Sequence, residues 1–564
     1  MTLESARHPA AAAVAEPTVT VEIDPHREIG RLDDNVFGHF LESAFFGNID
    51  GGVFDEQSPY ALPGPAPAGG LRADVIDACR ALGVPVVRWP GGNFTSAYRW
   101  GDGVGPRDAR PRRLELAWGG EESNRFGTDE FLTWCQAIGA QPYLVHSARD
   151  VEEAARWVEY TNYTGQTTLS RARAANGHPG PWGVRYWGVG NEVYGPWQMG
   201  HRSAEAYAAD AREHAVFMRR VDPTIQLIAV GAPPPQQERW ARALFARAGD
   251  LFDFVSLHLY GASLHLGGTD DYEAVVTQPR YFEDEIASCS EVLSTVAREL
   301  GIERRLSIAL DEWNIRHLEP AAWPPPVPGE RGGTASRGGH ADGVRGLAPE
   351  PGDGPPGDWR VNRYSSRTLA DALFYAGVFH ALYRQAGREV PVRMANTVNL
   401  VNANALLEVR PGGLVRSATY HVWDLYQNHL GRRVVPARVS GPRQSVAVRR
   451  GAVPAGQGFP TVTSSLPLLD VVATSDGDGR SVRAAVINRH RSLAVSARLV
   501  STVSGGLPPR AHVWDLGAGV ADVWAVNDLD HPDAVSAVDR GEIPLGEGGY
   551  RFGPHSLTLL RWST

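Results

Sequence analysis

Several short apolar stretches of this 564-residue chain end in side chains that could do acid–base chemistry. Glu192 ends one such stretch directly after Asn191, and Glu312 ends another directly after Asp311. Glu42 ends a third stretch nearer the N-terminus. Cleavage of a glycosidic bond needs two carboxyl groups that reach one pocket, one to protonate the leaving oxygen and one to attack the anomeric carbon or activate water. The pattern therefore favours a glycoside-cleaving site built from a pair of such carboxylates.

Other polar residues end the neighbouring stretches. Arg88 and Asn93 follow one of them, and His258 and Tyr260 end another. An arginine aimed into the pocket would lower the pKa of a nearby carboxyl group and keep it ionised. An amide such as that of Asn191 could hydrogen-bond a substrate hydroxyl beside the acid. Tryptophans gather around the same positions and favour a carbohydrate cleft: Trp89, Trp100, Trp187, Trp197 and Trp313.

The residues form no pattern typical of a metal site or a cofactor site. His146 and His258 lie at expected strand ends, but the sequence has no HxH or HExxH motif. All 55 basic residues are arginine, which excludes chemistry that needs a lysine, such as a Schiff base or a phosphate-binding loop. We therefore expect neither a metal nor a cofactor.

Eight apolar, β-rich runs alternate with helical patterns over residues 33–430. Amphipathic stretches lie between them at Thr128–Ile138, Ala204–Arg220, Phe282–Leu300 and Arg367–Gln385. Strands that alternate with helices predict a parallel α/β sheet, and eight strands predict a closed (β/α)8 TIM barrel with its active site at the carboxyl ends of the strands. The runs begin near Val36, Val84, Ala140, Val184, Ile225, Asp253, Arg305 and Pro391.

The helical periodicity ends near residue 430, and short alternating segments follow. Residues 431–564 are therefore predicted to form a C-terminal all-β sandwich, and residues 18–32 to add a strand to it. Residues 1–17 are expected to be disordered. A Pro/Gly-rich loop over residues 321–360 interrupts the barrel, and it is either a lid over the catalytic face or an insertion without function.

Composition limits the partners and the compartment. The chain is 43% hydrophobic, and its 64 acidic against 55 basic residues give a net charge of −9. Such a mildly acidic chain is not expected to bind nucleic acid or an anionic membrane. Three widely spaced cysteines without a CxxC motif predict free thiols in a reducing compartment. Because we expect neither a signal peptide nor a membrane span, the sequence predicts a soluble, cytoplasmic protein.

Four segments of the sequence resemble glycoside hydrolase family 51, whose members are chiefly α-L-arabinofuranosidases. They are RWPGGNFTSAYRWGDGVGP (Arg88–Pro106), FGTDEF (Phe126–Phe131), YWGVGNEVYGPWQMGH (Tyr186–His201) and DEWN (Asp311–Asn314). The resemblance runs from about Val36 to Tyr426. It implies a retaining hydrolase with a (β/α)8 barrel and a C-terminal β-sandwich, in agreement with the layout above.

Carried across residue by residue, the resemblance implies that Glu192 is the general acid/base and Glu312 the nucleophile. A retaining mechanism needs these two carboxyl groups only about 5–5.5 Å apart. Because Glu192 must start protonated, we expect burial and the negative charge of Glu312 to raise its pKa. The resemblance also implies substrate-binding or site-lining roles for Glu42, Arg88, Asn93, Asn191, His258 and Tyr260.

Three departures from the family pattern mark the chain as a divergent member. Ser43 follows Glu42 where the family usually has a histidine. Arg316 stands where an aromatic residue commonly lines the sugar subsite, and Asn399 stands where a glutamine typically reaches the sugar's outer hydroxyl. We expect Arg316 and Asn399 to bind substrate. A shorter Asn399 and a flexible Arg316 would leave space for the extra hydroxymethyl group of β-D-galactofuranose.

We therefore expect a retaining, exo-acting glycoside hydrolase that releases terminal non-reducing furanosyl residues, chiefly α-L-arabinofuranose, by double displacement. The alternatives are a β-D-galactofuranosidase on the same scaffold, an endo-β-glucanase, and a catalytically inactive carbohydrate-binding protein. Furanoside-containing oligosaccharides or glycosides are the expected partners. The resemblance also implies a homo-oligomer, often a hexamer.

Overall fold

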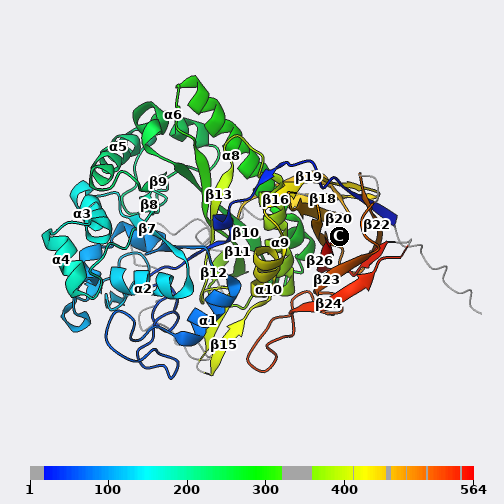
Figure 1. Cartoon of the computed structure of the whole chain (residues 1–564), viewed down its shortest axis with the longest axis horizontal. Helices are drawn as coiled ribbons and strands as arrows, with labels where there is room; N and C mark the ends of the chain where they lie inside the picture. Colours follow the sequence, from blue (N-terminus) through cyan, green and yellow to red (C-terminus); the bar gives the residue numbers. More distant parts are fainter. Residues whose placement is uncertain are drawn as a thin grey trace, which may run out of the picture.

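The computed structural model describes residues 18–320, 359–410, 412–452, 459–477, 479–502, 506–546 and 549–563. Within them the chain forms two parts, a ring of strands and helices and a β domain at its side (Figure 1). The segment 1–17, predicted to be disordered, lies outside the described residues. So do residues 321–358 of the predicted Pro/Gly-rich loop.

Eight parallel strands close into a barrel, which confirms the predicted (β/α)8 fold. Around the ring the order is β3, β4, β7, β8, β9, β10, β11 and β13, and β13 pairs with β3 again. A further strand, β12 (Trp359–Asn362), pairs antiparallel with the end of β11. The barrel strands are Gly38–Phe40 (β3), Val86–Trp89 (β4), Gln141–His146 (β7), Tyr186–Val189 (β8), Gln226–Ala229 (β9), Phe254–Ser263 (β10), Ser307–Pro320 (β11) and Val392–Thr397 (β13).

Side chains fill the inside of the barrel. The other face of the same strands is also apolar, since Val87, Leu144 and Trp187 pack into the large cluster shared with the surrounding helices. Strands that are buried on both faces need continuous apolar runs rather than alternation, which explains the runs in the sequence. The inner cluster is Val86, Tyr143, Val145, Tyr186, Ile228, Phe254, Ala309 and Met394.

Helices cover the outside of the barrel, and local sequence sets where they begin and end. Ser203 Oγ accepts a hydrogen bond from Ala206 N at the start of α5, and Gly139 (φ +80°) ends α2 in the left-handed conformation that suits glycine. Helix α9 is apolar on all sides because it lies buried between the barrel and the β domain. The helices are Ala73–Leu82 (α1), Thr128–Ile138 (α2), Val151–Asn162 (α3), Thr168–Ala175 (α4), Ala204–Val221 (α5), Gln237–Ala248 (α6), Tyr272–Thr277 (α7), Pro279–Glu299 (α8), Leu369–Arg384 (α9) and Ala418–Asp424 (α10).

The β domain consists of two main sheets, in agreement with the predicted C-terminal sandwich. One sheet has the order β17-β1-β22-β25 and the other β2-β16-β20-β21-β26-β23-β24. Strand β1 runs parallel to β22 and antiparallel to β17, so the N-terminal strand is built into this domain. Their bounds are Thr18–Ile23 (β1), Gly30–Arg31 (β2), Arg433–Val435 (β16), Ala437–Ser440 (β17), Leu469–Ser475 (β20), Ser481–Asn488 (β21), Val495–Ser501 (β22), Arg510–Leu516 (β23), Ala537–Pro544 (β24), Tyr550–Phe552 (β25) and Ser556–Ser563 (β26).

Three two-stranded hairpins lie outside the barrel and the main sheets. They are Arg113–Leu114 with Glu121–Glu122 (β5, β6), Leu407–Arg410 with Gly413–Arg416 (β14, β15), and Arg443–Arg449 with Thr461–Pro467 (β18, β19).

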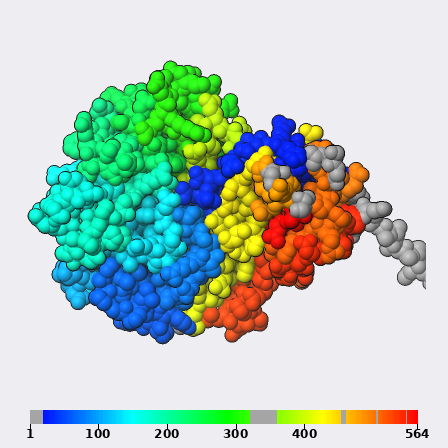
Figure 2. Space-filling model, in the orientation of Figure 1, coloured from blue at the N-terminus to red at the C-terminus, as the bar shows by residue number. Residues whose placement is uncertain are grey.

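A buried ion-pair network joins the two parts, which pack against each other in Figure 2. Asp470 on β20 accepts hydrogen bonds from His380 Nδ1 (3.0 Å) and Arg384 Nη1 (2.7 Å) of α9. Arg489 Nη1 donates to the second oxygen of Asp470 (2.5 Å). The β domain is therefore tied to the barrel through α9.

The thiols of Cys79, Cys135 and Cys289 are free and buried. Burial raises the pKa of each of them. Among the described residues, no helix combines the length and the apolar character needed to cross a membrane.

Candidate active site

The predicted carboxylates meet at the carboxyl ends of the barrel strands. Glu192 lies three residues beyond β8, in a tight turn after Gly190 (φ +91°). Its own φ is +43°, a left-handed conformation that is costly for a glutamate and concentrates at functional sites. Glu312 lies within β11, opposite His258 of β10 in the strand pairing. Two long strands and one strained turn therefore position the three side chains.

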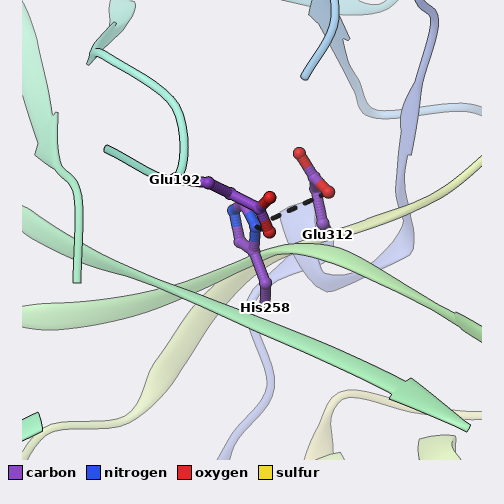
Figure 3. A group of neighbouring side chains, drawn as sticks. All are labelled: Glu192, His258 and Glu312. Atoms are coloured by element: carbon purple, nitrogen blue, oxygen red, sulfur yellow. Dashed lines mark hydrogen bonds and ion pairs between the residues drawn. The ribbon is translucent and has the colours of Figure 1, made fainter. Parts of the chain in front are cut away.

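Glu192, His258 and Glu312 form one group of largely buried side chains, shown in Figure 3. One ligand atom from each residue lies within 4.8 Å of the others. The side chains of Glu192 and Glu312 are only 10% and 7% exposed. A carboxylate separation of about 5 Å suits a retaining glycosidase, because the nucleophile and the acid must flank the same anomeric centre without room for a water between them.

Two donors hold Glu312 in place from opposite sides. Arg88 Nη1 donates to Glu312 Oε1 (2.7 Å), and the Tyr260 hydroxyl donates to Glu312 Oε2 (2.7 Å). Arg88 is fully buried, yet the charges of Asp311 and Glu312 raise its pKa, so it stays a cation. The arginine and tyrosine thus aim the Glu312 carboxylate at the centre of the site.

Arg88 also orients the amide of Asn191. Its Nη2 donates to Asn191 Oδ1 (2.6 Å), so the Nδ2 group of Asn191 faces away from the arginine. This buried Nδ2 has no hydrogen-bond partner among the described residues. A hydroxyl group of a substrate would satisfy it. A Cβ atom on Gly92 would lie 2.9 Å from Glu312 Oε1 and 3.5 Å from Asn191 Nδ2, so a larger residue there would displace the Glu312 carboxylate.

Glu192 accepts three hydrogen bonds. Trp197 Nε1 donates to Oε2 (3.0 Å), while the Tyr194 hydroxyl (3.2 Å) and His258 Nδ1 (2.8 Å) lie against Oε1. Burial by itself would raise the pKa of Glu192, but the hydrogen bond and positive charge of His258 outweigh it and lower that pKa to about 2. The raised pKa expected from the sequence is therefore wrong for the site without substrate.

His258 takes the proton that was expected on Glu192. Burial would lower the pKa of His258, but the charge of Glu312 and the hydrogen bonds to Asp311 and Glu192 raise it to about 10. Its Nε2 lies 3.3 Å from Asp311 Oδ1. Asp311 in turn accepts a hydrogen bond from the Tyr143 hydroxyl (2.8 Å). The charge of Arg88 lowers the pKa of Asp311.

Glu42 and Asn93 lie at one wall of the site. Glu42 Oε1 accepts from Gly92 N (3.1 Å), Phe94 N (2.9 Å) and Trp118 Nε1 (3.1 Å). The turn that carries Asn93 therefore wraps around the Glu42 carboxylate. Trp118 comes from the loop between β5 and β6, which reaches into the site from outside the barrel.

Arg316 and Asn399, two of the three departures from the family pattern, are both buried. Arg316 stacks on the ring of Tyr260, with its Cζ 4.0 Å from the ring centroid, and its charge contributes to the lowered pKa of Glu192. Asn399 Nδ2 donates to Ala403 O (3.2 Å) within its own loop. Arg316 is thus packed rather than flexible, and the amide nitrogen of Asn399 is turned toward its own backbone.

Sequence reasoning missed several residues of the site. The sequence predicted no separate role for Asp311, although it pairs with both Arg88 and His258. Tyr194 follows Glu192 by two residues, a spacing that could have suggested a contact with the acid. Tyr143 and Trp118 carried no local signal, because only the barrel topology brings them to the site.

Among the described residues, Glu192, His258 and Glu312 are also the one group whose geometry could hold a metal ion. The charge of protonated His258 opposes a cation at that position. The same three side chains fit proton transfer and nucleophilic attack without further groups.

Known proteins resemble the chain over nearly its whole length. Residues 78–275 match the family model "Alpha-L-arabinofuranosidase 1 domain", and residues 311–556 match "Alpha-L-arabinofuranosidase C-terminal domain". Alpha-L-arabinofuranosidase C of Emericella nidulans is 33% identical over 565 residues, which cover 96% of this chain and 97% of that protein. The intracellular exo-alpha-(1->5)-L-arabinofuranosidase of Streptomyces lividans is 33% identical over 447 residues, which cover 76% of this chain and 60% of that protein.

A solved structure agrees with these matches. The thermostable GH51 alpha-L-arabinofuranosidase from Thermotoga petrophila RKU-1 has a TM-score of 0.78 and 30% identity, over 96% of this chain and 99% of that one. A closed barrel with a buried carboxylate pair at its strand ends and a β-sandwich at its side, matched by these relatives, defines a glycoside hydrolase. The chain belongs to glycoside hydrolase family 51.

Proposed function

We propose that the protein is a retaining, exo-acting α-L-arabinofuranosidase in which Glu312 is the nucleophile and Glu192 the general acid/base. The observation that carries this proposal is the pair of buried carboxylates within 4.8 Å of each other, one in the turn after β8 and the other within β11. That separation places both groups on one anomeric centre, as double displacement requires.

In the first step, Glu312 attacks the anomeric carbon and the bond to the leaving oxygen breaks. Arg88 and Tyr260 hold the two carboxylate oxygens, so the attack starts from one fixed orientation. A proton from Glu192 goes to the leaving oxygen, which departs as an alcohol. The sugar is then linked to Glu312 as an ester.

In the second step, Glu192 takes a proton from a water molecule as the water oxygen attacks the same carbon. The ester bond breaks and the Glu312 carboxylate leaves with its original charge. Arg88 and Tyr260 bind that charge as it develops, which stabilises the transition state. Two inversions at the anomeric carbon give net retention.

The relatives support the choice of sugar and of chain end. The Emericella nidulans relative is named an alpha-L-arabinofuranosidase, and the Streptomyces lividans relative an exo-alpha-(1->5)-L-arabinofuranosidase. Within the site, the Nδ2 group of Asn191 and the wall that Glu42 and Asn93 form offer polar contacts for furanose hydroxyls. The substrates would be oligosaccharides or glycosides with terminal arabinofuranosyl residues.

A β-D-galactofuranosidase is the second candidate. Arg316, whose charge acts on Glu192, and the short Asn399, which is bound to its own loop, favour it, because they stand where an aromatic residue and a glutamine are common in the family. An endo-β-glucanase and an inactive binding protein remain outcomes of the test below.

A panel of p-nitrophenyl furanosides and pyranosides, assayed with the purified protein, tests the proposal. We expect kcat/KM to be highest for the α-L-arabinofuranoside. A higher kcat/KM for the β-D-galactofuranoside would change the proposed substrate to a galactofuranoside and leave the proposed mechanism unchanged. Polymer digestion to internal fragments would indicate an endo-glucanase, and no turnover of any substrate would indicate a binding protein.

We further propose a cytoplasmic location and a homo-oligomeric state, with a hexamer as the expected assembly. The name of the Streptomyces lividans relative includes the word intracellular, and the three buried free thiols fit a reducing compartment. Light scattering of the purified protein would measure the assembly.

A further inference from the structure

We propose that His258 stores the proton of the reaction and exchanges it with Glu192 in step with the charge on Glu312. This inference rests on the proposed roles of Glu192 and Glu312 and adds a third residue, which acts through Glu192. In the free enzyme, the proton that Glu192 needs for catalysis lies on His258 instead.

The geometry places His258 between the groups that it would serve. Its Nδ1 lies 2.8 Å from Glu192 Oε1 and 3.5 Å from Glu312 Oε2 (Figure 3). Its Nε2 lies 3.3 Å from Asp311 Oδ1. The imidazole therefore has one nitrogen for proton exchange with Glu192 and another that faces the Asp311 carboxylate. This carboxylate favours the tautomer of the neutral ring that keeps its proton on Nε2.

The charged groups around His258 come from three elements. Glu192 approaches from the turn after β8, and Asp311 and Glu312 from β11. Two cations lie beyond these carboxylates: Arg88 of β4 pairs with Asp311 and Glu312, and Arg316 of β11 stacks on Tyr260. The three carboxylates in direct reach of the imidazole favour its cationic form. Glu312 is the largest of the influences that raise the pKa of His258.

The charge on Glu312 changes during the reaction, and this change would move the proton. As Glu312 attacks the anomeric carbon, its negative charge is lost to the new C–O bond. The Nδ1 proton of His258 is then held less tightly and passes to Glu192, which delivers this one proton to the leaving oxygen. His258 ends the first step neutral, with its remaining proton on Nε2, which faces Asp311.

The second step reverses the transfer. Water gives one proton to Glu192 and its oxygen to the anomeric carbon, and the ester bond to Glu312 breaks. As the charge of Glu312 returns, the proton on Glu192 passes to His258 Nδ1. One water is consumed, one sugar and one alcohol are released, and the site regains its starting proton.

The pH dependence of kcat/KM tests this scheme, because it reports the ionisations of the free enzyme. In the wild type, the alkaline limb is expected to extend to about pH 10, where His258 loses its proton. In His258→Asn, Glu192 must hold the proton alone. We therefore expect kcat/KM to decline at a pH that is lower than in the wild type by about two units or more. An alkaline decline of kcat/KM at the same pH as in the wild type would overturn the proposal. A residue that only packs or binds substrate would change KM without shifting the pH of this decline.

The chain offers a matched control in His146, another buried histidine at a strand end. His146 Nδ1 accepts from Ala148 N, and burial with the nearby His214 lowers its pKa well below the usual value. The ring is therefore neutral and stores no proton. His146→Asn should leave the alkaline limb where it is in the wild type, and a shift equal to that of His258→Asn would contradict the assignment.

A spectroscopic readout separates this inference from the proposed function. In 15N-histidine-labelled enzyme, the His258 resonances, identified by their loss in His258→Asn or His258→Gln, should show an imidazolium up to about pH 9. They should show a neutral ring once Glu312 is esterified by a 2-deoxy-2-fluoro arabinofuranoside. A neutral ring in the free enzyme would overturn the inference even if the enzyme is active. An imidazolium in an enzyme that cleaves no furanoside would leave the inference about the proton standing and refute the proposed function.

Discussion

Replacing Tyr260 by phenylalanine removes one hydrogen bond from the nucleophile and keeps the ring on which Arg316 stacks. The Tyr260 hydroxyl donates to Glu312 Oε2 at 2.7 Å, while Arg88 continues to hold Oε1. A hydrogen bond to a charged group contributes about 1.5–3 kcal/mol. A change of that size in a barrier alters a rate constant by about 10- to 150-fold.

Loss of this hydrogen bond should change the rate constants of the two chemical steps differently. In the first step the charge on Glu312 disappears, so the bond stabilises the starting carboxylate more than the transition state. In the second step the charge returns, so the bond stabilises the transition state more than the ester. Tyr260→Phe should therefore slow the second step by about 10- to 150-fold and leave the first step unslowed.

Stopped-flow release of p-nitrophenol from p-nitrophenyl α-L-arabinofuranoside measures both steps. We expect a burst of about one equivalent per site, followed by a slow steady state, because the glycosyl-enzyme accumulates. The matched control is Tyr194→Phe, which removes a phenol hydroxyl from Glu192 instead (3.2 Å) and should give no burst. An unchanged steady-state rate for Tyr260→Phe, or a slower rate without a burst, would show that the Tyr260 hydroxyl does not stabilise the returning charge on Glu312.

Three further predictions concern the acid, the glycine beside the nucleophile, and the domain junction. Glu192→Ala should lower kcat far more for substrates with poor leaving groups than for activated aryl furanosides, and equal losses would remove Glu192 from its role. Gly92→Ala should lower kcat by about 100-fold through a clash with Glu312, with an unchanged melting temperature as the check that the fold is intact. Asp470→Asn should destabilise the protein by about 3–5 kcal/mol in urea unfolding at pH 7. Because folding lowers the pKa of Asp470, this difference should shrink as the pH falls below about 4, and a constant difference would contradict it.

The barrel was predictable because each of its strands is a short apolar run with a helical pattern after it. Apolar character on both faces is what a strand inside a ring of helices needs, so local sequence and topology agree. The lengths of β10 and β11 were not predictable in the same way. Their ends extend to Ser263 and Pro320 because they pair with each other and with β12, over separations that a sequence pattern does not show.

The candidate site was likewise predictable only in part. Glu192 and Glu312 could be found from their positions after apolar runs and from the resemblance of their surroundings. The protonation state of Glu192 could not be predicted from the sequence. It depends on His258, which is 66 residues away, and on the carboxylates that surround the His258 imidazole. The same holds for Arg316, whose sequence position suggested mobility while the fold packs it on Tyr260.

Mapping where a trapped sugar is attached tests the assignment of Glu312 as the nucleophile most directly. The wild-type enzyme would be incubated with an activated 2-deoxy-2-fluoro-α-L-arabinofuranoside, digested, and analysed by mass spectrometry. We expect one fluoroarabinosyl group per chain, on the peptide that contains Glu312 and on that carboxylate. A label on Glu192 or on any other residue would contradict it, and so would hydrolysis with inversion and no label at all.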